Sequence, residues 1–317
     1  MDILVTGGAG FIGSHFIQLI LKSTDIRVTN IDALTYAGQH KSIQESDSKD
    51  RYRFIQADIS NLDKVEEMVF DRHYDAIINF AAETHVDRSI QQADPFIQTN
   101  IVGTHELIKR VKAGQAKKMI QISTDEVYGS LQPGEEPFTE LHPLSPNNPY
   151  SASKAGADLL VRSYYQTYEL PLIITRCSNN YGPGQYPEKL IPKTIERALH
   201  DEAIPVYGSG ANIRDWVYVE DHCRAIVAVM NEGVPGEIYN IGGSCEKSNL
   251  EVVRSIVAYL RKPESLINHV PDRLGHDFRY AMNWSKINRT LGWEPLVSFE
   301  EGIQKTLEWA LQSQSKQ

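Results

Sequence analysis

Short runs of strand length that are rich in apolar residues, separated by stretches with a helical pattern, fill the first half of this 317-residue sequence. The runs are Ile3-Leu4-Val5, Val28 to Ile31, Arg53 to Ile55, Ala76 to Phe80, Met119 to Ile122 and Leu172 to Thr175. Strands that are apolar at every position are buried on both faces, which is typical of a parallel sheet covered by helices. The pattern therefore predicts an α/β fold with a doubly wound, Rossmann-like sheet.

The regularity breaks after Arg176, where residues 179–184 are dense in turn-forming Asn, Gly and Pro. Farther on, the sequence predicts strands near Val206, at Trp216 to Val219 and at Ile238 to Ile241, and helices at 190–199, 220–230, 250–260, 285–291 and 300–311. We expect a dinucleotide-binding domain at residues 1–177, to which a segment at about 212–243 returns. Residues 178–317 should form mainly a smaller, interwoven lobe that binds the substrate, with a cleft between the two parts.

The charge and the cysteine content limit the partners and the compartment of the protein. The formal net charge is −9 and no basic run occurs, which argues against a nucleic-acid-binding protein. The longest purely apolar run, Ala225 to Met230, is too short to cross a membrane. Cys177, Cys223 and Cys245 lack the spacing of metal ligands and indicate free thiols in a reducing compartment. A strand follows Met1-Asp2 directly, so we expect no signal peptide. From the cysteines we expect no metal site, and from both observations together a cytoplasmic protein.

Three glycines follow the first predicted strand and open a helix, in the spacing Gly7-x-x-Gly10-x-x-Gly13. Glycine permits a tight turn and lets backbone N–H groups approach a pyrophosphate. Asp32 ends the second predicted strand, where a carboxylate accepts hydrogen bonds from a ribose diol and repels a 2′-phosphate. The pattern favours NAD over NADP as the cofactor. A glycine turn that only packs a helix on a strand is the alternative.

Tyr150 and Lys154 are four residues apart in a predicted helix that Asn148 caps and Pro149 begins. Residues at this spacing share one helix face, so the charge of Lys154, aided by the nicotinamide, is expected to lower the pKa of Tyr150. A tyrosinate would then take a proton from a sugar hydroxyl while a hydride leaves for NAD. The alternative is a surface pair that has this spacing by chance.

Two adjacent acids, Asp125 and Glu126, follow Ser123-Thr124 where a strand of the predicted sheet ends. Adjacent carboxyl groups serve as an acid and a base when their surroundings push their pKa values apart. An acid and a base within a hydride-transfer site indicate a second reaction, the loss of water. The alternative is a solvated loop pair.

The glycine turn, Ser123-Thr124 and the Tyr150/Lys154 pair resemble the extended short-chain dehydrogenase/reductase family. Longer stretches narrow the resemblance to the nucleotide-sugar branch, and within it to the 4,6-dehydratases that act on dTDP-glucose. They are Leu34 to Gly38, Ala81 to Ser89, Thr124 to Gly129, Pro146 to Ala155, Arg176 to Gln185, Arg214 to His222 and Asp272 to Tyr280. The resemblance spans nearly the whole chain. One departure is Asn283-Trp284, where the family pattern leads us to expect an aspartate.

The resemblance implies a lyase reaction with three steps, in which dTDP-glucose becomes dTDP-4-keto-6-deoxyglucose. Tyr150, helped by Thr124 and Lys154, oxidises C4 with NAD. Glu126 then removes the C5 proton while a protonated Asp125 gives its proton to the departing C6 hydroxyl, and C6 is finally reduced. The product would feed a deoxysugar, with rhamnose the first candidate, and the implied assembly is a homodimer formed through the stretch Ile97 to Val111 and the helix at Tyr150 to Tyr168.

The resemblance also implies a set of binding residues. Those expected to hold NAD are Gly7, Gly10, Phe11, Ile12, Gly13, Asp32, Thr35, Asp58, Ile59, Ala81, Ala82, Thr99, Tyr150, Lys154, Cys177 and Asn179. Those expected to hold the nucleotide sugar are Thr84, Asn179, Glu188, Lys189, Leu190, Tyr207, Arg214, Asn249, Arg273, His276 and Tyr280. Within the second set the arginines and His276 should face the diphosphate, because guanidinium groups match phosphate oxygens. Two alternatives stay open: another nucleotide-sugar enzyme of the family, such as a second 4,6-dehydratase, a 4-epimerase or a decarboxylase, and an NAD-sensing regulator without catalysis.

Overall fold

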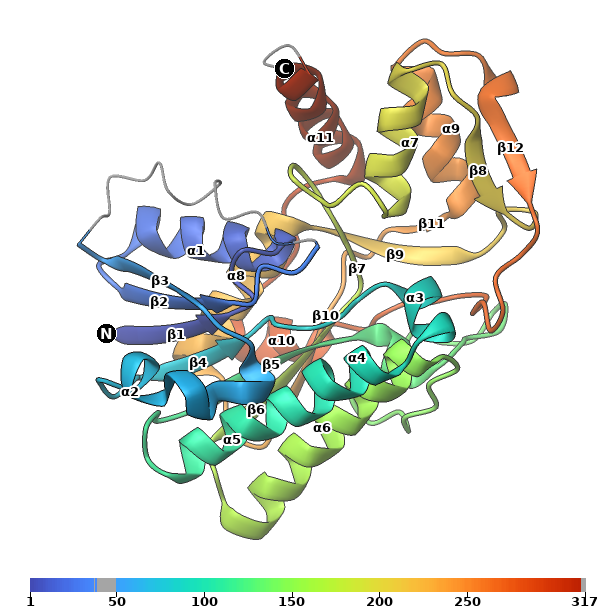
Figure 1. Ribbon diagram of the computed structural model, residues 1–317. Coiled ribbons are helices and arrows are strands. Elements are labelled where there is room, and N and C mark those ends of the chain that lie inside the picture. Colours follow the sequence, from blue (N-terminus) through green and yellow to red (C-terminus); the bar gives the residue numbers. More distant parts are fainter. Residues whose placement is uncertain (37, 39–49, 315–317) are drawn as a thin grey trace.

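A seven-stranded parallel sheet forms the centre of the protein, whose computed structural model describes residues 1–36, 38 and 50–314 (Figure 1). Its strand order is β10-β6-β5-β4-β1-β2-β3. The strands are β1 (Asp2–Thr6), β2 (Arg27–Asp32), β3 (Tyr52–Gln56), β4 (Ala76–Asn79), β5 (Met119–Thr124), β6 (Leu172–Cys177) and β10 (Ile238–Ile241). Ala37, which belongs to one of the stretches that carry the family resemblance, lies outside the described residues.

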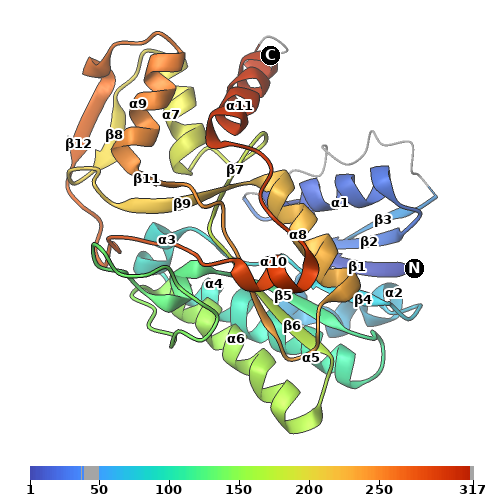
Figure 2. The ribbon, with the colours of Figure 1, turned by 180° about the vertical axis from the view of Figure 1, so that it is seen from behind.

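Helices cover both faces of this sheet, as Figures 1 and 2 show from opposite sides. One face carries α1 (Phe11–Ser23), α8 (Val219–Glu232) and α10 (Ser285–Leu291), and the other carries α2 (Glu66–Val69), α5 (Thr104–Lys112), α6 (Pro149–Tyr168), a 3₁₀ helix (Ile59–Val65) and a π-helix (Ile97–Gly103). Along β1, Ile3 and Val5 pack into the first core and Leu4 into the second. The sheet is therefore buried on both faces, and the predicted fold class is confirmed.

The C-terminal lobe contains two small sheets and three helices. A three-stranded sheet joins β7 (Asn179–Tyr181), β9 (Ile213–Tyr218) and β11 (Glu246–Ser248), and a parallel pair joins β8 (Ile204–Tyr207) and β12 (Ile267–Val270). The helices are α7 (Leu190–Leu199), α9 (Asn249–Tyr259) and α11 (Phe299–Gln314). Trp216, Ile191, Val252 and Phe299 share the core of this lobe. The remaining elements are α3 (Val86–Gln91), α4 (Asp94–Phe96) and the 3₁₀ turns Asp125–Tyr128 and Glu264–Leu266.

The predicted elements differ from the structure mainly in the C-terminal lobe. The strand expected at Trp216 to Val219 is wrong at its end, because Val219 begins α8. The strands β7, β11 and β12 lie where the sequence predicted none, since they are three or four residues long and lack a continuous apolar run. Within the segment expected to return to the first domain, α8 packs against the large sheet, β10 is an edge strand of that sheet, and β9 lies in the three-stranded sheet. The domain boundary itself stays a prediction.

The start of α6 has the predicted cap. The side chain of Asn148 accepts a hydrogen bond from the backbone N–H of Ser151 at 2.9 Å, and Pro149 occupies the first helical turn. Such a cap satisfies an N–H group that the helix leaves without a partner. It fixes the position at which the helix begins. The directions of Tyr150, in the first turn, and of Lys154, one turn later, are thereby fixed as well.

A buried ion pair joins α6 to the neighbouring strand β6, and it generates a stability prediction. Arg176 Nε lies 2.9 Å from Asp158 Oδ2, and both side chains are almost fully buried. Asp158→Asn leaves the buried guanidinium without a counter-charge, so we expect the free energy of unfolding to fall by about 3–5 kcal/mol in urea titrations.

The matched control is Asp63→Asn. The Asp63 side chain is 76% exposed, and its partner Arg110 keeps a second ion pair with Glu66. We expect this variant to lose less than about 1 kcal/mol. Equal losses in the two variants would contradict the role assigned to burial.

Candidate active site

A cavity of about 710 Å³ lies between the C-terminal lobe and the ends of β1, β4, β5 and β6. Every residue proposed from the sequence or from the family resemblance lines it. They are Gly7, Gly10, Phe11, Ile12, Gly13, Asp32, Thr35, Asp58, Ile59, Ala81, Ala82, Thr84, Thr99, Thr124, Asp125, Glu126, Tyr150, Lys154, Cys177, Asn179, Glu188, Lys189, Leu190, Tyr207, Arg214, Asn249, Arg273, His276 and Tyr280. The fold thus gathers residues up to 273 positions apart in the chain, and their individual roles stay predictions.

The turn between β1 and α1 forms one end of the cavity. Gly7 has a φ of +70°, and a Cβ atom there would lie 2.5 Å from the backbone nitrogen of Ala81. Only glycine fits so close an approach in this backbone conformation. Gly10 precedes α1 and supplies no capping side chain, so the helix N-terminus offers its N–H groups and its partial positive charge to the cavity.

Asp32 ends β2 beside this turn. Its carboxylate accepts hydrogen bonds from the backbone N–H groups of Ala9 at 2.9 Å and Leu34 at 2.8 Å. Its hydrogen bond with Ala9 therefore holds the glycine turn in place. Asp58 follows β3 and caps the next helical turn, with its side chain accepting from Ser60 N at 2.8 Å. These two acids and the small side chains of Ala81 and Ala82 shape one wall of the cavity.

Tyr150 and Lys154 lie side by side at the buried start of α6. The Lys154 ammonium donates to the backbone oxygen of Ile122 on β5 at 2.7 Å, and the backbone N–H of Tyr150 donates to Ser89 Oγ at 3.1 Å. Burial raises the pKa of Tyr150 well above its ordinary value, and Glu126 adds to the rise. A hydrogen bond from Thr124 opposes this rise, and the expected lowering of the Tyr150 pKa by Lys154 together with the nicotinamide stays a prediction. Burial also lowers the pKa of Lys154.

Asp125 and Glu126 form the first turn after β5, where Asp125 is buried and Glu126 is partly buried. Burial, with the neighbouring Glu126, raises the pKa of Asp125 well above its ordinary value. Its Oδ1 accepts from Thr124 Oγ1 at 3.1 Å, while its Oδ2 has no partner within the described residues. Burial raises the pKa of Glu126 too, but the nearby cations Arg214 and Lys189 oppose that rise. The surroundings therefore favour a protonated Asp125 beside an ionised Glu126.

Cationic groups from the C-terminal lobe face these acids. Arg214 donates to the backbone oxygens of Ile213 at 2.7 Å and Asp277 at 3.0 Å, and its guanidinium lies 4.4 Å from the centre of the Tyr280 ring. Lys189 donates to the backbone oxygen of Thr84 at 2.9 Å. A cavity that holds a glycine turn, a Tyr/Lys pair, two acids and several cations suits a dinucleotide and an anionic sugar derivative together.

The family model for GDP-mannose 4,6 dehydratase matches residues 4–306 of the chain. The chain belongs to the GDP-mannose 4,6-dehydratase family. The match covers the sheet, the cavity and almost all of the C-terminal lobe.

Known members of this 4,6-dehydratase family resemble the chain over almost its full length. The low-salt glycan biosynthesis protein Agl12 of Haloferax volcanii is 50% identical, with 98% of this chain and 99% of that protein covered. The dTDP-glucose 4,6-dehydratase of Neisseria gonorrhoeae is 49% identical, with 99% and 97% covered. Among solved structures, DesIV of Streptomyces venezuelae, a dTDP-glucose 4,6-dehydratase with NAD and dTDP bound, has a TM-score of 0.95 and 44% identity, covering 100% of this chain and 98% of its own.

Three acids of the cavity, Glu83, Asp87 and Asp277, were not among the residues that the sequence or the 4,6-dehydratase family resemblance suggested. Asp87 pairs with Arg273, and Asp277 accepts a hydrogen bond from the Tyr280 hydroxyl. Asp87 lies within the stretch Ala81 to Ser89 that carried the resemblance, but a partly exposed acid on a helix has no pattern that marks it. The Asn283 departure has a local role, because its side chain accepts from the backbone N–H of Ser285 at 2.9 Å where α10 begins.

Metal and membrane sites were searched in the same ranges, 1–36, 38 and 50–314. No group of three or more His, Cys, Asp or Glu side chains there is placed to hold a metal ion. No helix within those ranges combines the length and the apolar character that crossing a membrane requires.

The raised pKa of Asp125 predicts a pH-dependent stability difference. A carboxyl group whose pKa is higher in the folded than in the unfolded state destabilises the fold as the pH rises from about 3.9, the unfolded value, through the folded value. We therefore expect Asp125→Asn to gain stability relative to the unsubstituted protein as the pH rises above about 4. Urea unfolding at a series of pH values measures the difference.

Glu126→Gln should show the same sign, because burial raises that pKa as well. A stability difference for Asp125→Asn that stays flat between pH 4 and pH 8 would show that the carboxyl is hydrated and ionises normally (about 3.9 for an aspartate).

Proposed function

We propose that the chain is an NAD-dependent dTDP-glucose 4,6-dehydratase, a lyase that converts dTDP-glucose to dTDP-4-keto-6-deoxyglucose. The observation that carries this proposal is the pair of a buried Asp125 and a partly buried Glu126 in the same cavity as Thr124, Tyr150 and Lys154. A relative of this activity at 49% identity and a solved relative with NAD and dTDP bound support the substrate and the cofactor. An epimerase needs no acid to expel the C6 hydroxyl, and a regulator needs neither the pair nor Tyr150.

The glycine-turn end of the cavity fits NAD. The close approach of Gly7 to Ala81 and the uncapped N-terminus of α1 leave room and N–H groups for a pyrophosphate. Asp32 would hold the adenosine ribose, and its negative charge disfavours the 2′-phosphate of NADP. Asp58 and Ile59 would border the adenine. When bound, NAD accepts a hydride from C4 and returns it to C6, so the reaction involves no net oxidation.

The first duty of the chain's own residues is to remove the proton of the C4 hydroxyl. Tyr150 takes that proton, and Thr124, whose hydroxyl hydrogen-bonds with Tyr150, steadies the same oxygen. Since burial raises the pKa of Tyr150, ionisation requires positive charge beside it, and Lys154 is the chain's own source. Its bond to the Ile122 oxygen holds that charge in place.

The second duty is to eliminate water across C5 and C6. A ketone at C4 makes the C5 proton acidic, and Glu126, kept basic by Arg214 and Lys189, removes it. Asp125, kept protonated by burial and by the charge of Glu126, donates to the departing C6 hydroxyl. After reduction at C6, the proton held on Glu126 is available to return to C5. One pair of adjacent acids thus performs both halves of the elimination.

The wider setting is also part of this proposal. We place the protein in the cytoplasm, where its product would supply a 6-deoxyhexose such as rhamnose. We propose a homodimer formed through the helices at Ile97 to Val111 and at Tyr150 to Tyr168. Ile97, Leu159 and Tyr168 on those helices are large apolar side chains that are 48%, 54% and 49% exposed and are available to a partner subunit. Sedimentation equilibrium distinguishes a dimer from a monomer.

The activity is tested by incubating the protein with dTDP-glucose and detecting a 4-keto-6-deoxy product by its absorbance in alkali and by mass. UDP-glucose and GDP-mannose, assayed alongside, separate the proposed substrate from those of other 4,6-dehydratases. Formation of dTDP-galactose without loss of water would establish a 4-epimerase instead.

Glu126→Gln separates oxidation from elimination. The amide keeps the size of the side chain but cannot accept the C5 proton, so turnover should fall by roughly two to four orders of magnitude. A single turnover with dTDP-glucose should stall with absorbance of reduced cofactor, because Tyr150 still oxidises C4.

Tyr150→Phe is the matched comparison, since it should give neither reduced cofactor nor product. Dehydration by Glu126→Gln at close to the normal rate would remove Glu126 from the mechanism.

A further inference from the structure

The two arginines that face the diphosphate end of the cavity are held in different ways. Arg214 is fixed by hydrogen bonds to backbone carbonyls, which are neutral. Arg273 instead lies beside a carboxylate from the other side of the cleft, with its Nε 2.7 Å from Asp87 Oδ1. One arginine is therefore preset for an anion, and the other is already paired with one.

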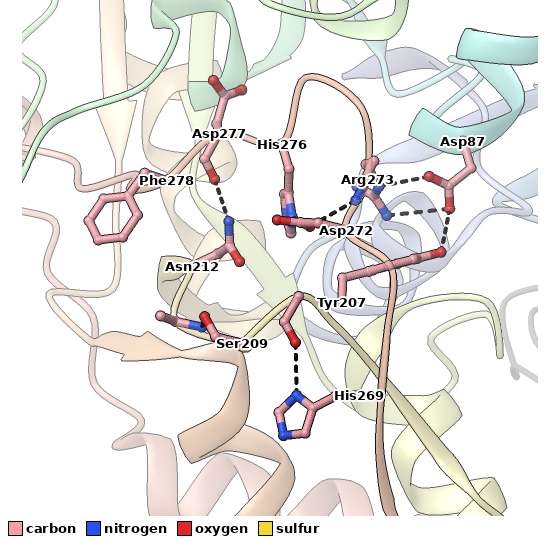
Figure 3. A network of polar contacts seen from close by, with 12 residues as sticks. Asp87, Tyr207, Ser209, Asn212, His269, Asp272, Arg273, His276, Asp277 and Phe278 are labelled. Carbon is pink, nitrogen blue, oxygen red and sulfur yellow. Dashed lines mark hydrogen bonds and ion pairs between the residues drawn. The ribbon is translucent and has the colours of Figure 1, made fainter.

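Asp87 belongs to α3, which lies between β4 and β5 in the chain, whereas Arg273 follows β12 in the C-terminal lobe. Figure 3 shows its carboxylate reached by Arg273 and, from a third element, by Tyr207. The Tyr207 hydroxyl donates to Asp87 Oδ2 at 3.2 Å, and the guanidinium of Arg273 lies 5.1 Å from the Tyr207 ring. Because Asp87, Tyr207 and Arg273 all line the cavity, this cluster joins its two walls across the opening.

The geometry of the Asp87–Arg273 ion pair is that of a weak contact, in which Arg273 can exchange Asp87 for another anion. The Nε–H of Arg273 has no hydrogen-bond acceptor among the described residues despite the short separation, and its Nη2 reaches Asp87 Oδ2 only at 3.4 Å. By contrast, Arg279 and Glu246 form a two-pronged pair, at 2.6 and 2.8 Å. Both side chains of the Asp87–Arg273 pair are partly exposed, at 31% and 25%, so the attraction is moderated by water.

We infer that Asp87 is a latch: its carboxylate holds Arg273 across the cleft and is displaced from it when the diphosphate of the nucleotide sugar binds. A diphosphate carries more charge than a carboxylate and offers oxygens to the whole guanidinium fork, so the exchange favours the ligand. Asp87 thereby weakens binding of substrate and product alike and assists release. It is a positioning residue, which acts through Arg273. The inference rests on the proposed function, because it requires a diphosphate-linked substrate.

The test is titration of dTDP into the NAD-loaded protein by calorimetry. Asp87→Asn keeps the shape of the side chain and removes the competing charge, so the affinity for dTDP should rise roughly three- to fivefold, the range of a partly exposed ion pair. Asp87→Glu keeps the charge and should show no such rise. In the Arg273→Gln background, Asp87→Asn should bring no gain, because the arginine for which it competes is gone.

Steady-state kinetics supply a second readout. Tighter binding of the diphosphate in both the ground state and the transition state should lower KM in Asp87→Asn without raising kcat. A structural role for Asp87 would do the opposite, raising KM and weakening dTDP. Weaker or unchanged dTDP binding in Asp87→Asn would overturn the latch, and so would a gain that persists without Arg273.

Failure of the proposed function gives a different result. If the unsubstituted protein bound no dTDP, the substrate assignment would fall, and the same variants titrated with UDP and GDP would decide the latch by the same criteria.

Discussion

Burial of four ionisable side chains at the end of β5 and the start of α6 is the constraint on which this structure depends. Asp125, Tyr150 and Lys154 are buried and Glu126 is partly buried, and burial is the leading cause of every pKa shift among them. Buried charges are tolerated only where hydrogen bonds and partners are supplied. The parallel sheet supplies them because β5 and β6 end beside each other, and the C-terminal lobe closes the opposite side of the site.

The sequence predicts the large sheet well because physical necessity makes its strands conspicuous. A strand covered on both faces must be apolar at successive positions, and β10 was found at its observed bounds for that reason. The glycine turn was equally visible, since Gly7 has a backbone that other residues avoid. The strands β7, β11 and β12 were missed because their pairing is decided by neighbours distant in the chain, and their own side chains are mostly polar.

The site residues were visible from the sequence to the extent that the fold brings them into one cavity, but their electrostatics were not. A spacing of four places Lys154 beside Tyr150, and from that alone a lowered tyrosine pKa seemed to follow. Whether a nearby cation prevails depends on how much water remains, which no local pattern encodes. In the folded chain burial raises the pKa of Tyr150, so its ionisation needs positive charge beside it.

The same argument applies to the opposite wall of the cavity. Arg214, Lys189 and Arg273 concentrate positive charge where a diphosphate must lie, and without a ligand those charges repel one another. Carboxylates relieve that repulsion in two ways. Glu126 remains among the cations and uses them to stay basic, whereas Asp87, outside the reacting centre, neutralises the one arginine that backbone carbonyls do not hold. Arrival of the diphosphate therefore changes the partner of Arg273 while the surroundings of Glu126 keep their fixed cation, Arg214. Substrate binding and acid–base chemistry can draw on one cluster of cations because its members are anchored differently.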